Sequence, residues 1–272
     1  MNHDAPKPLN SQLGTYEKVV GLLPPGRGAR ILDVGAGEGF FCRRLHELGY
    51  RVDACDIEPR AFRCPEVPFT RVDLNAPLPI ANEQYDCVVS IEVIEHVENH
   101  FLFLRELLRV TKPGGRVIVT TPNVLSLPAR WYTFLYGYSE CSPLPLDAGL
   151  DDWHMEHVNP IGVPQLLAIF ERYGAELEVL TTNRLRRSSW LPMILLYPLL
   201  AVAIRLRFLR RKHAGRHALH RRHIRWMLHP ANLMGRITVA VARKRLVVDR
   251  RGPTPAEPEP SEVAVPCSGG TA

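Results

Sequence analysis

Apolar and polar residues alternate along most of the chain with two different periods. Short apolar runs rich in Val and Ile are typical of strands covered on both faces, whereas longer segments repeat their apolar positions as a helix does. We predict strands at 30–34, 51–55, 69–72, 85–90, 116–121, 177–182 and 236–242. We predict helices at 9–23, 40–48, 101–110 and 164–173. This order indicates an α/β fold in which a mostly parallel sheet carries helices on both faces.

The same pattern divides the chain into parts. We expect an N-terminal helix region at 1–27 and a sheet-forming core at 28–183. A helical basic and apolar insertion between the sixth and seventh strands should follow at 184–235, then a last strand at 236–251 and a disordered tail at 252–272. The tail contains five Pro residues and no core-forming pattern. Residues 125–158 are irregular and rich in aromatic residues and Pro, and we expect them to pass over the top of the sheet.

The run 31–41, Ile-Leu-Asp-Val-Gly-Ala-Gly-Glu-Gly-Phe-Phe, predicts a buried strand that leads through a glycine turn into a helix. Such a turn presents backbone N–H groups to a ligand at a helix N-terminus. The glycines at 35, 37 and 39 follow a G-x-G-x-G spacing. A dinucleotide-binding turn would follow G-x-G-x-x-G and would place its third glycine at position 40, where this chain has Phe40. The spacing therefore disfavours a nicotinamide-dependent enzyme.

Two acidic residues follow the next two strands. Asp56 ends the second strand, 19 residues after Gly37, where a carboxylate can accept hydrogen bonds from both hydroxyls of a ribose. Asp73 comes directly after the third strand. A helix or turn cap is the alternative for Asp56, and a ribose-binding acid would also suit a nicotinamide enzyme. An exposed loop residue is the alternative for Asp73.

Together with Tyr85–Glu92 and the turn Pro113–Arg116, these segments resemble the ordered motifs of class I S-adenosylmethionine-dependent methyltransferases. The resemblance covers about 28–182 and, more loosely, 236–244. It implies a Rossmann-like, seven-stranded sheet of order 3-2-1-4-5-7-6 with an antiparallel last strand. It also implies S-adenosyl-L-methionine as the cofactor, bound by Asp33, Gly35, Ala36, Gly37, Gly39, Asp56, Ile57, Asp73, Leu74 and Ile91.

A short group of polar residues, Glu92-Val-Ile-Glu95-His96, follows the fourth strand and is similar to the same place in ubiquinone-biosynthesis O-methyltransferases. Two carboxylates and an imidazole could hold a divalent metal that orients a catechol-like pair of oxygens. Alternatively, His96 is the general base that removes the acceptor proton. In the third interpretation both Glu residues cap the following helix and bond the cofactor loop. We predict no metal site and keep His96 as a candidate catalytic residue.

A second candidate base, His157, precedes the apolar run that leads into the helix at 164–173. In methyltransferases that resemble this chain, a His at this place lies over the acceptor pocket. A metal pair formed with His154 is a weaker interpretation, because the expected third ligand does not follow. A polar lid residue is the remaining alternative.

Positive charge is concentrated in one segment. The chain has a formal net charge of +6, yet residues 179–248 contain no Asp or Glu and hold 16 of the 34 Lys and Arg residues. The other residues carry 18 basic and 28 acidic side chains, a net charge of −10. The basic character therefore belongs to this segment and not to the whole surface.

Inside the basic segment, residues 190–204 form an uncharged apolar run of 15 residues with arginines on both sides. It is shorter than the roughly 20 residues of a spanning helix, and Pro192 and Pro198 are expected to interrupt it. A single crossing would also leave the seventh strand on the wrong side of the membrane. We therefore expect 184–225 to lie on an anionic membrane surface, with Trp190 and Tyr197 at headgroup depth. A buried helical cap or dimer contact is the alternative, and nucleic-acid binding is disfavoured by the long apolar run.

The six cysteines include no C-x-x-C pair, and the N-terminus lacks the basic start and apolar run of a signal peptide. We expect reduced thiols in a cytoplasmic protein that is peripheral on the inner face of the membrane. The leading function is methyl transfer from S-adenosylmethionine to a small or lipid-linked acceptor, at oxygen. A non-catalytic methyltransferase-like docking module and a nicotinamide-dependent oxidoreductase are the alternatives.

Overall fold

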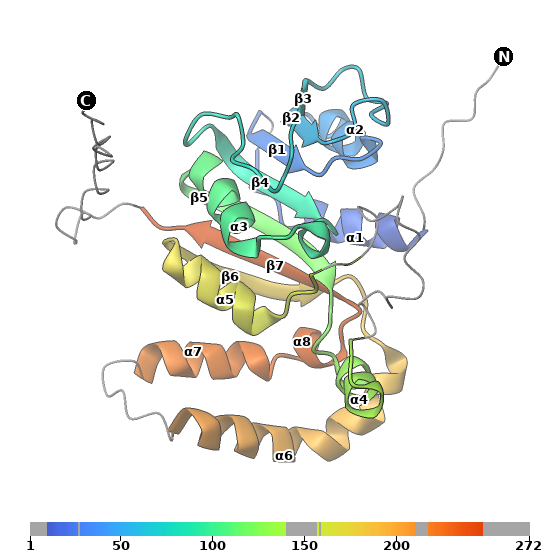
Figure 1. Cartoon of the computed structure of the whole chain (residues 1–272), viewed down its shortest axis with the longest axis vertical. Coiled ribbons are helices and arrows are strands. Elements are labelled where there is room, and N and C mark those ends of the chain that lie inside the picture. The colour runs from blue at the N-terminus through green and yellow to red at the C-terminus, as the bar shows by residue number, and fades with distance from the viewer. Residues whose placement is uncertain (1–9, 27, 140–156, 158, 210–216, 247–272) are drawn as a thin grey trace, which may run out of the picture.

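The structure is a computed structural model that describes residues 10–26, 28–139, 157, 159–209 and 217–246 (Figure 1). A single seven-stranded sheet runs in the order β3-β2-β1-β4-β5-β7-β6. Its strands are β1 (Arg30–Val34), β2 (Arg51–Asp56), β3 (Phe69–Arg71), β4 (Tyr85–Ile91), β5 (Thr111–Pro122), β6 (Ala175–Thr182) and β7 (Ile237–Lys244). The first five strands pair in parallel, and β7 is antiparallel to both of its neighbours. The predicted order and the antiparallel last strand are confirmed.

Helices cover both faces of this sheet. The predicted helices correspond to α1 (Asn10–Val20), α2 (Phe40–Glu47), α3 (His100–Val110) and α5 (Val163–Arg172). One core cluster joins β4 to α3 and α5 through Val88, and the other joins it to α1 and α2 through the adjacent Val89. Both side chains are fully buried, because successive residues of a strand point to opposite faces. A continuous apolar run in β4 is therefore what a sheet covered on both faces requires.

The start of β5 differs from the prediction. We expected a turn at 113–115 and a strand from Arg116, but the strand begins at Thr111 and contains the Pro-Gly-Gly segment as an irregularity in its pairing with β4. Gly114 has a φ of 75°, and a Cβ on Gly115 would lie 2.9 Å from the backbone oxygen of Asp86. The glycines thus allow β5 to lie close to β4 at this point, whereas the composition of the segment predicts a turn.

The excursion after β5 contains a helix that was not predicted, α4 (Leu127–Tyr136). The Ser126 side chain accepts a hydrogen bond from the backbone N–H of Ala129 and caps its start. Gly137 ends it in the left-handed conformation, with a φ of 80°. Residues 140–156 and 158 of this excursion, with His154, lie outside the described residues.

In the described part of the insertion between β6 and β7 there are three α-helices, α6 (Trp190–Leu209), α7 (His217–Met227) and α8 (Pro230–Met234). The expected interruption at Pro192 and Pro198 was wrong. Pro192 lies in the first turn, where a missing N–H costs nothing, and the helix continues through Pro198. By length and composition alone, α6 is long and apolar enough to cross a membrane. The predicted tail at 252–272 lies outside the described residues.

The insertion packs on the rest of the molecule through α7, which lies between α5 and α6 (Figure 1), and through α8, which contacts β6. Arg222 of α7 forms ion pairs of 3.3 Å with Glu171 and 2.8 Å with Glu176. Trp226, also on α7, is buried in the core cluster that contains α5. In this arrangement α6 is the outermost layer of the molecule, away from the sheet.

Candidate active site

The glycine turn after β1 is bonded to the end of β2. The backbone N–H groups of Gly35 and Ala36 donate to the carbonyl oxygen of Cys55 at 2.9 and 3.2 Å. The N–H of Gly37 donates to Oδ2 of Asp56 at 2.8 Å. These bonds hold the predicted turn beside the predicted ribose-binding carboxylate.

The three glycines of the turn serve different purposes. Gly35, Gly37 and Gly39 have φ values of 79°, 52° and 81°, which other residues rarely adopt. A Cβ on Gly35 would collide with the Val93 side chain, and one on Gly39 would come within 2.7 Å of Phe62. A Cβ on Gly37 would meet nothing within 4 Å. Packing therefore requires two of the glycines, whereas Gly37 leaves open the side of the turn where a ligand can approach the backbone.

The Asp56 carboxylate is held by backbone donors on both oxygens. Its Oδ1 accepts hydrogen bonds from the N–H groups of Ile57 at 2.6 Å and Glu58 at 3.3 Å, and its Oδ2 accepts the bond from Gly37. Asp56 is thus a turn cap, which was one of the alternatives. A carboxylate offers about four acceptor positions, so capping leaves it able to accept a further hydrogen bond from a ligand.

The remaining predicted cofactor residues follow the carboxyl ends of neighbouring strands. Asp73 comes after β3 and accepts a hydrogen bond from the Asn75 N–H at 2.9 Å, while Leu74 packs partly buried against the core. Ile57 is half exposed after β2, and Ile91 is partly buried at the end of β4. Because these strands are parallel and adjacent, the residues share one edge of the sheet, which we call the donor edge.

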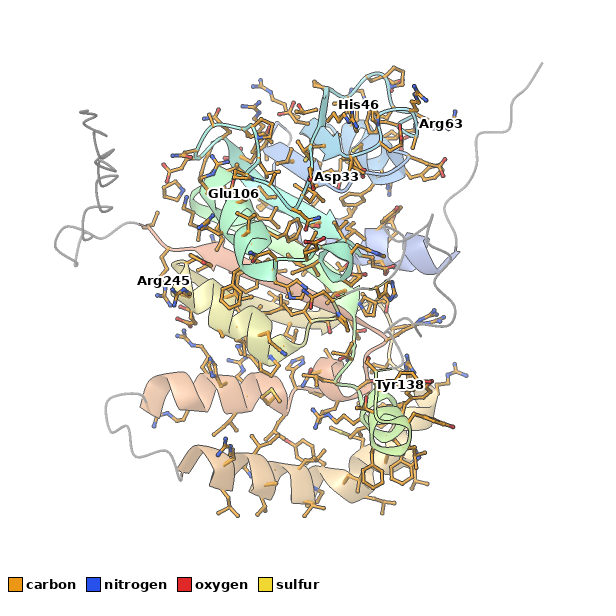
Figure 2. The ribbon with its side chains drawn as sticks, viewed as in Figure 1. Asp33, His46, Arg63, Glu106, Tyr138 and Arg245 are labelled. Carbon is orange, nitrogen blue, oxygen red and sulfur yellow. The ribbon has the colours of Figure 1, made fainter. Side chains whose placement is uncertain are left out.

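Asp33 is buried, with 2% of its surface exposed, and receives a hydrogen bond from the Cys42 thiol at 3.1 Å. Figure 2 shows it in the interior of the molecule, with His46 and Arg63 at the periphery. Burial raises its pKa to about 7, and the nearby carboxylate of Asp56 adds to the effect. Asp33 therefore supports the turn from within instead of facing its open side.

Tyr16 of α1 is a member of the site that sequence reasoning missed. Its ring lies 5.2 Å from that of Phe41, at the start of the helix that follows the glycine turn. Burial raises its pKa, and the carboxylates of Asp33 and Glu92 raise it further. The helical pattern of α1 contains no feature that would distinguish Tyr16 from its apolar neighbours.

The segment after β4 makes a sharp turn. Glu92 has a φ of 56°, and its N–H donates to the Thr120 carbonyl at 3.1 Å and to the Thr120 hydroxyl at 3.0 Å. The following helix α3 is capped by Asn99, whose side chain accepts a bond from Leu102 at 3.0 Å. The interpretation of Glu92 and Glu95 as caps of that helix was therefore wrong.

Glu95 is buried, with 1% of its surface exposed, in a short 3₁₀ turn (Ile94–His96). Among the described residues, neither of its carboxylate oxygens has a partner in good hydrogen-bond geometry, although the Thr121 hydroxyl is close enough to offset part of the burial. Burial raises the pKa of Glu95 to about 8. A carboxyl group of this kind is unusual outside functional sites.

The structure brings the two candidate histidines together. The rings of His96 and His157 are 4.9 Å apart in an edge-to-face arrangement. With Glu95 they form a group whose possible ligand atoms all lie within 4.8 Å of one another, which a divalent metal could occupy. Glu92, which the sequence grouped with Glu95 and His96, is not part of it. The group could equally share a proton.

Asn159, two residues after His157, bonds to the turn that carries His96 and was also missed. Its backbone N–H donates to the Glu95 carbonyl at 3.0 Å. Its side chain donates to the carbonyls of Val97 at 3.3 Å and Glu98 at 3.0 Å. Asn159 is thus bonded to the turn that carries His96, although the two are far apart in the sequence.

Comparison with known proteins confirms the resemblance. Residues 32–119 match the family model described as a methyltransferase domain. A probable S-adenosylmethionine-dependent methyltransferase of Mycolicibacterium smegmatis is 29% identical over 56% of this chain and 53% of its own length. A similarly named protein of Mycobacterium tuberculosis is 31% identical, over 50% and 54%. The chain thus spans about half the length of these relatives.

A third relative, the ubiquinone biosynthesis O-methyltransferase of a Chelativorans species, is 33% identical over 36% of this chain and 42% of its own length. Among solved structures, an S-adenosylmethionine-dependent methyltransferase from Mesorhizobium loti has a TM-score of 0.52 at 20% identity, covering 85% of this chain and 98% of its own. The [4+2]-cyclase SpnF has a TM-score of 0.51 at 18% identity, covering 85% and 81%. These likenesses confirm the fold, and the cyclase shows that the fold alone does not determine the reaction.

Proposed function

We propose that this chain, of which residues 32–119 match a methyltransferase domain, binds S-adenosylmethionine at the donor edge and transfers its methyl group to a small acceptor. The observation that carries the proposal is the pairing of Gly37 with Asp56. An open backbone turn and a ribose-binding carboxylate meet there within 2.8 Å, inside the segment that matches the family. Neither the glycine turn nor the carboxylate would support the proposal alone.

The chain's residues provide binding and orientation. We assign the ribose hydroxyls to Asp56, the adenine to Asp73 and Leu74, and the methionine end to Gly37 and the neighbourhood of Ile91. The bound cofactor would supply a sulfonium-activated methyl group. The protein therefore has to align the acceptor with that methyl group and to exclude water.

An acceptor hydroxyl must also lose its proton, and we assign this step to the histidine pair. His96 and His157 both remain candidates, since their rings are in contact. The adjacent Glu95, whose pKa is raised to about 8, can hold or release a proton near neutral pH. This combination supports an oxygen acceptor, because an already deprotonated or more nucleophilic atom would not need it.

We further propose that the acceptor is a small or lipid-linked molecule presented at the cytoplasmic face of the membrane. The support is the exposed apolar helix α6, which lies in the most basic segment of the chain. A nucleic-acid partner would not explain this apolar exposure.

The test is turnover of labelled S-adenosylmethionine against a membrane-lipid extract, with mass analysis of the methylated product. We expect label in a lipid-soluble product and equimolar S-adenosylhomocysteine. Cofactor binding by calorimetry, without product from any fraction, would favour the docking-module alternative. Binding of a nicotinamide dinucleotide in place of S-adenosylmethionine would refute the proposal.

A further inference from the structure

The helix α6 is apolar around its circumference, and most of its apolar side chains are exposed. Ala201 is the only buried residue between Trp190 and Arg207, a stretch the structure describes in full. The exposed members are Trp190, Leu191, Ile194, Leu195, Leu196, Tyr197, Leu199, Val202 and Leu206. A helix that is apolar around its circumference is normally buried in a protein core or in lipid. Large exposed apolar patches mark binding sites.

The unpredicted helix α4 extends this patch. Apart from Thr133, its exposed residues are aromatic or aliphatic, with exposed fractions of 61% for Trp131, 77% for Phe134, 54% for Leu135 and 59% for Tyr136. The rings of Trp131 and Phe134 stack at 5.6 Å, so they present one apolar face to solvent.

The two helices belong to one surface. Leu127 of α4 packs with Leu233 and Met234 of α8, and Met193 and Leu200 of α6 pack against the same cluster. Figure 1 shows α4 beside the N-terminal part of α6, and Figure 2 shows Tyr138 next to α4. We call the exposed side chains of α4 and α6 together the docking surface.

We infer that the docking surface seats the protein on the leaflet of an anionic membrane, with α6 lying in the interface and α4 as a second anchor. Charge supports this occupant, because 179–248 contain no acidic residue and Arg187, Arg205 and Arg207 are exposed along η3 (Arg187–Ser189) and α6. Trp and Tyr residues suit headgroup depth, where one end of the side chain is apolar and the other wet. The consequence for catalysis rests on the proposed function.

The connections of α6 favour a helix that lies on the membrane over one that crosses it. β6 precedes the insertion, β7 follows it, and both belong to one sheet. On its way back, α7 packs against α6 and is bound to Glu171 and Glu176 by Arg222. A crossing would have to separate α6 from α7 and α8.

A second copy of the chain is a poorer occupant. In a twofold dimer the same patch meets itself, so the interface would gather the exposed arginines of both copies with no acidic partner from the segment. Anionic headgroups satisfy these charges, and a second copy does not.

The docking surface is coupled to the donor edge through Asn123, just after β5. Its Nδ2 donates to the carbonyls of Ala231 at 3.1 Å, Asn232 at 3.0 Å and Gly235 at 3.0 Å. These bonds join the carboxyl end of β5 to α8, on which both docking helices pack. The edge of the sheet that carries the candidate site therefore has a fixed position relative to the leaflet. An acceptor held in that leaflet would enter at this edge.

The test uses the full chain with vesicles of phosphatidylcholine alone or mixed with phosphatidylglycerol. We expect sedimentation only with the anionic vesicles and release by high salt. Leu195→Glu on α6 and Phe134→Glu on α4 should each weaken binding by about tenfold or more, since each places a charge where an apolar side chain enters lipid. Leu246→Glu is the matched control, because Leu246 is 68% exposed but lies on neither helix, and it should bind normally.

Absence of vesicle binding, or equal binding by all variants, would overturn the inference. Loss with Leu195→Glu and none with Phe134→Glu would refute the role of α4. A concentration-dependent dimer that the same substitutions abolish would replace the membrane with a second copy. Cofactor calorimetry without lipid separates this inference from the proposed function. Vesicle binding without cofactor binding would refute only the proposed function.

Discussion

The donor edge and the docking surface lie in one molecule but are built by different means. The donor edge consists of backbone N–H groups and of carboxylates that those N–H groups orient, as Gly37 and Asp56 do. The docking surface consists mainly of apolar side chains on two helices, together with exposed arginines, and these follow no fixed spacing. The donor edge therefore depends on backbone geometry, whereas the docking surface depends on amino-acid composition.

This difference agrees with the extent of the family match. The segment that matches the methyltransferase domain, 32–119, contains the glycine turn, Asp56 and Asp73, and it ends before α4 and α6. A backbone-built site tolerates few substitutions, because each glycine or carboxylate has a specific position to fill. A lipid-facing surface needs only to remain apolar and basic, so sequence comparison detects it poorly.

The largest effect that can test this difference between the two regions is the loss of kcat when a candidate base is removed. Substitution of His96 or His157 by Ala should lower kcat by about 100- to 10,000-fold for the residue that takes the acceptor proton. Cofactor affinity should be unchanged, because neither residue belongs to the donor edge. Single-turnover rates with the identified acceptor, alongside calorimetry, measure both quantities. His46→Ala, at an exposed position of α2, is the control and should retain full activity.

If both histidine variants keep the wild-type rate, proton removal is not their function and the assignment of an oxygen acceptor loses its support. If only the His157→Ala variant does so, His157 is a lid residue and His96 remains the base.

Next in size is the effect of Asp56→Ala on cofactor binding. A carboxylate that accepts hydrogen bonds from two ribose hydroxyls contributes about 1.5–3 kcal/mol for each, so affinity should fall by at least about 100-fold. Asp53→Ala is the matched control on the same strand, where the side chain forms a 2.8 Å ion pair with Arg30 away from the turn. Calorimetric titration with S-adenosylhomocysteine distinguishes the two. Equal affinities would mean that Asp56 is only a turn cap.

Most of the fold could be predicted because each strand of the parallel core is a short run flanked by polar or glycine residues. The failures have identifiable causes. Pro113, Gly114 and Gly115 have the composition of a turn, but they lie within β5 as an irregularity where it meets β4. The helix α4 was missed because aromatic residues in a region rich in Pro indicated an irregular chain, although Ser126 and Gly137 are ordinary signals for its ends.

The site was less predictable wherever it depends on tertiary contact. Spacing identified the glycine turn and Asp56, because the parallel pairing of the consecutive strands β1 and β2 brings their carboxyl ends together. His96 and His157 come from segments that are distant in the sequence and are also joined by Asn159, and no local pattern indicates their contact. Tyr16 enters the site only because α1 packs on that face of the sheet.

A smaller effect, on stability, distinguishes the buried carboxyl of Glu95 from an ordinary buried ion pair. The folded protein keeps the Glu95 proton up to about pH 8, against an ordinary pKa of 4.5, so stability should fall as the pH rises between these values. Glu95→Gln removes the charge and should raise stability at pH 9 by about 1–3 kcal/mol, with little change at pH 5. Thermal unfolding at both pH values measures this.

Glu106→Gln is the opposite case. Burial alone would raise the pKa of Glu106, but its 2.7 Å ion pair with Arg109 and its bond from the Leu78 N–H lower it on balance. Its stabilisation is present above the ordinary pKa, so this variant should be less stable at pH 9. A similar response of both variants to pH would show that Glu95 has an ionised partner.

The smallest effect separates backbone strain from ligand contact at a glycine. Gly37 and Gly137 both have positive φ values, 52° and 80°, and an added Cβ would meet nothing within 4 Å at either position. Alanine at either should therefore cost a similar strain, about 1–2 kcal/mol. Only Gly37→Ala should also weaken cofactor binding, by about tenfold, because its methyl group would occupy the open side of the turn. Chemical denaturation and calorimetry on the two variants measure the two effects separately. Equal cofactor affinity in both would mean that the ligand does not approach the backbone at Gly37, and the donor edge would then rest on its carboxylates alone.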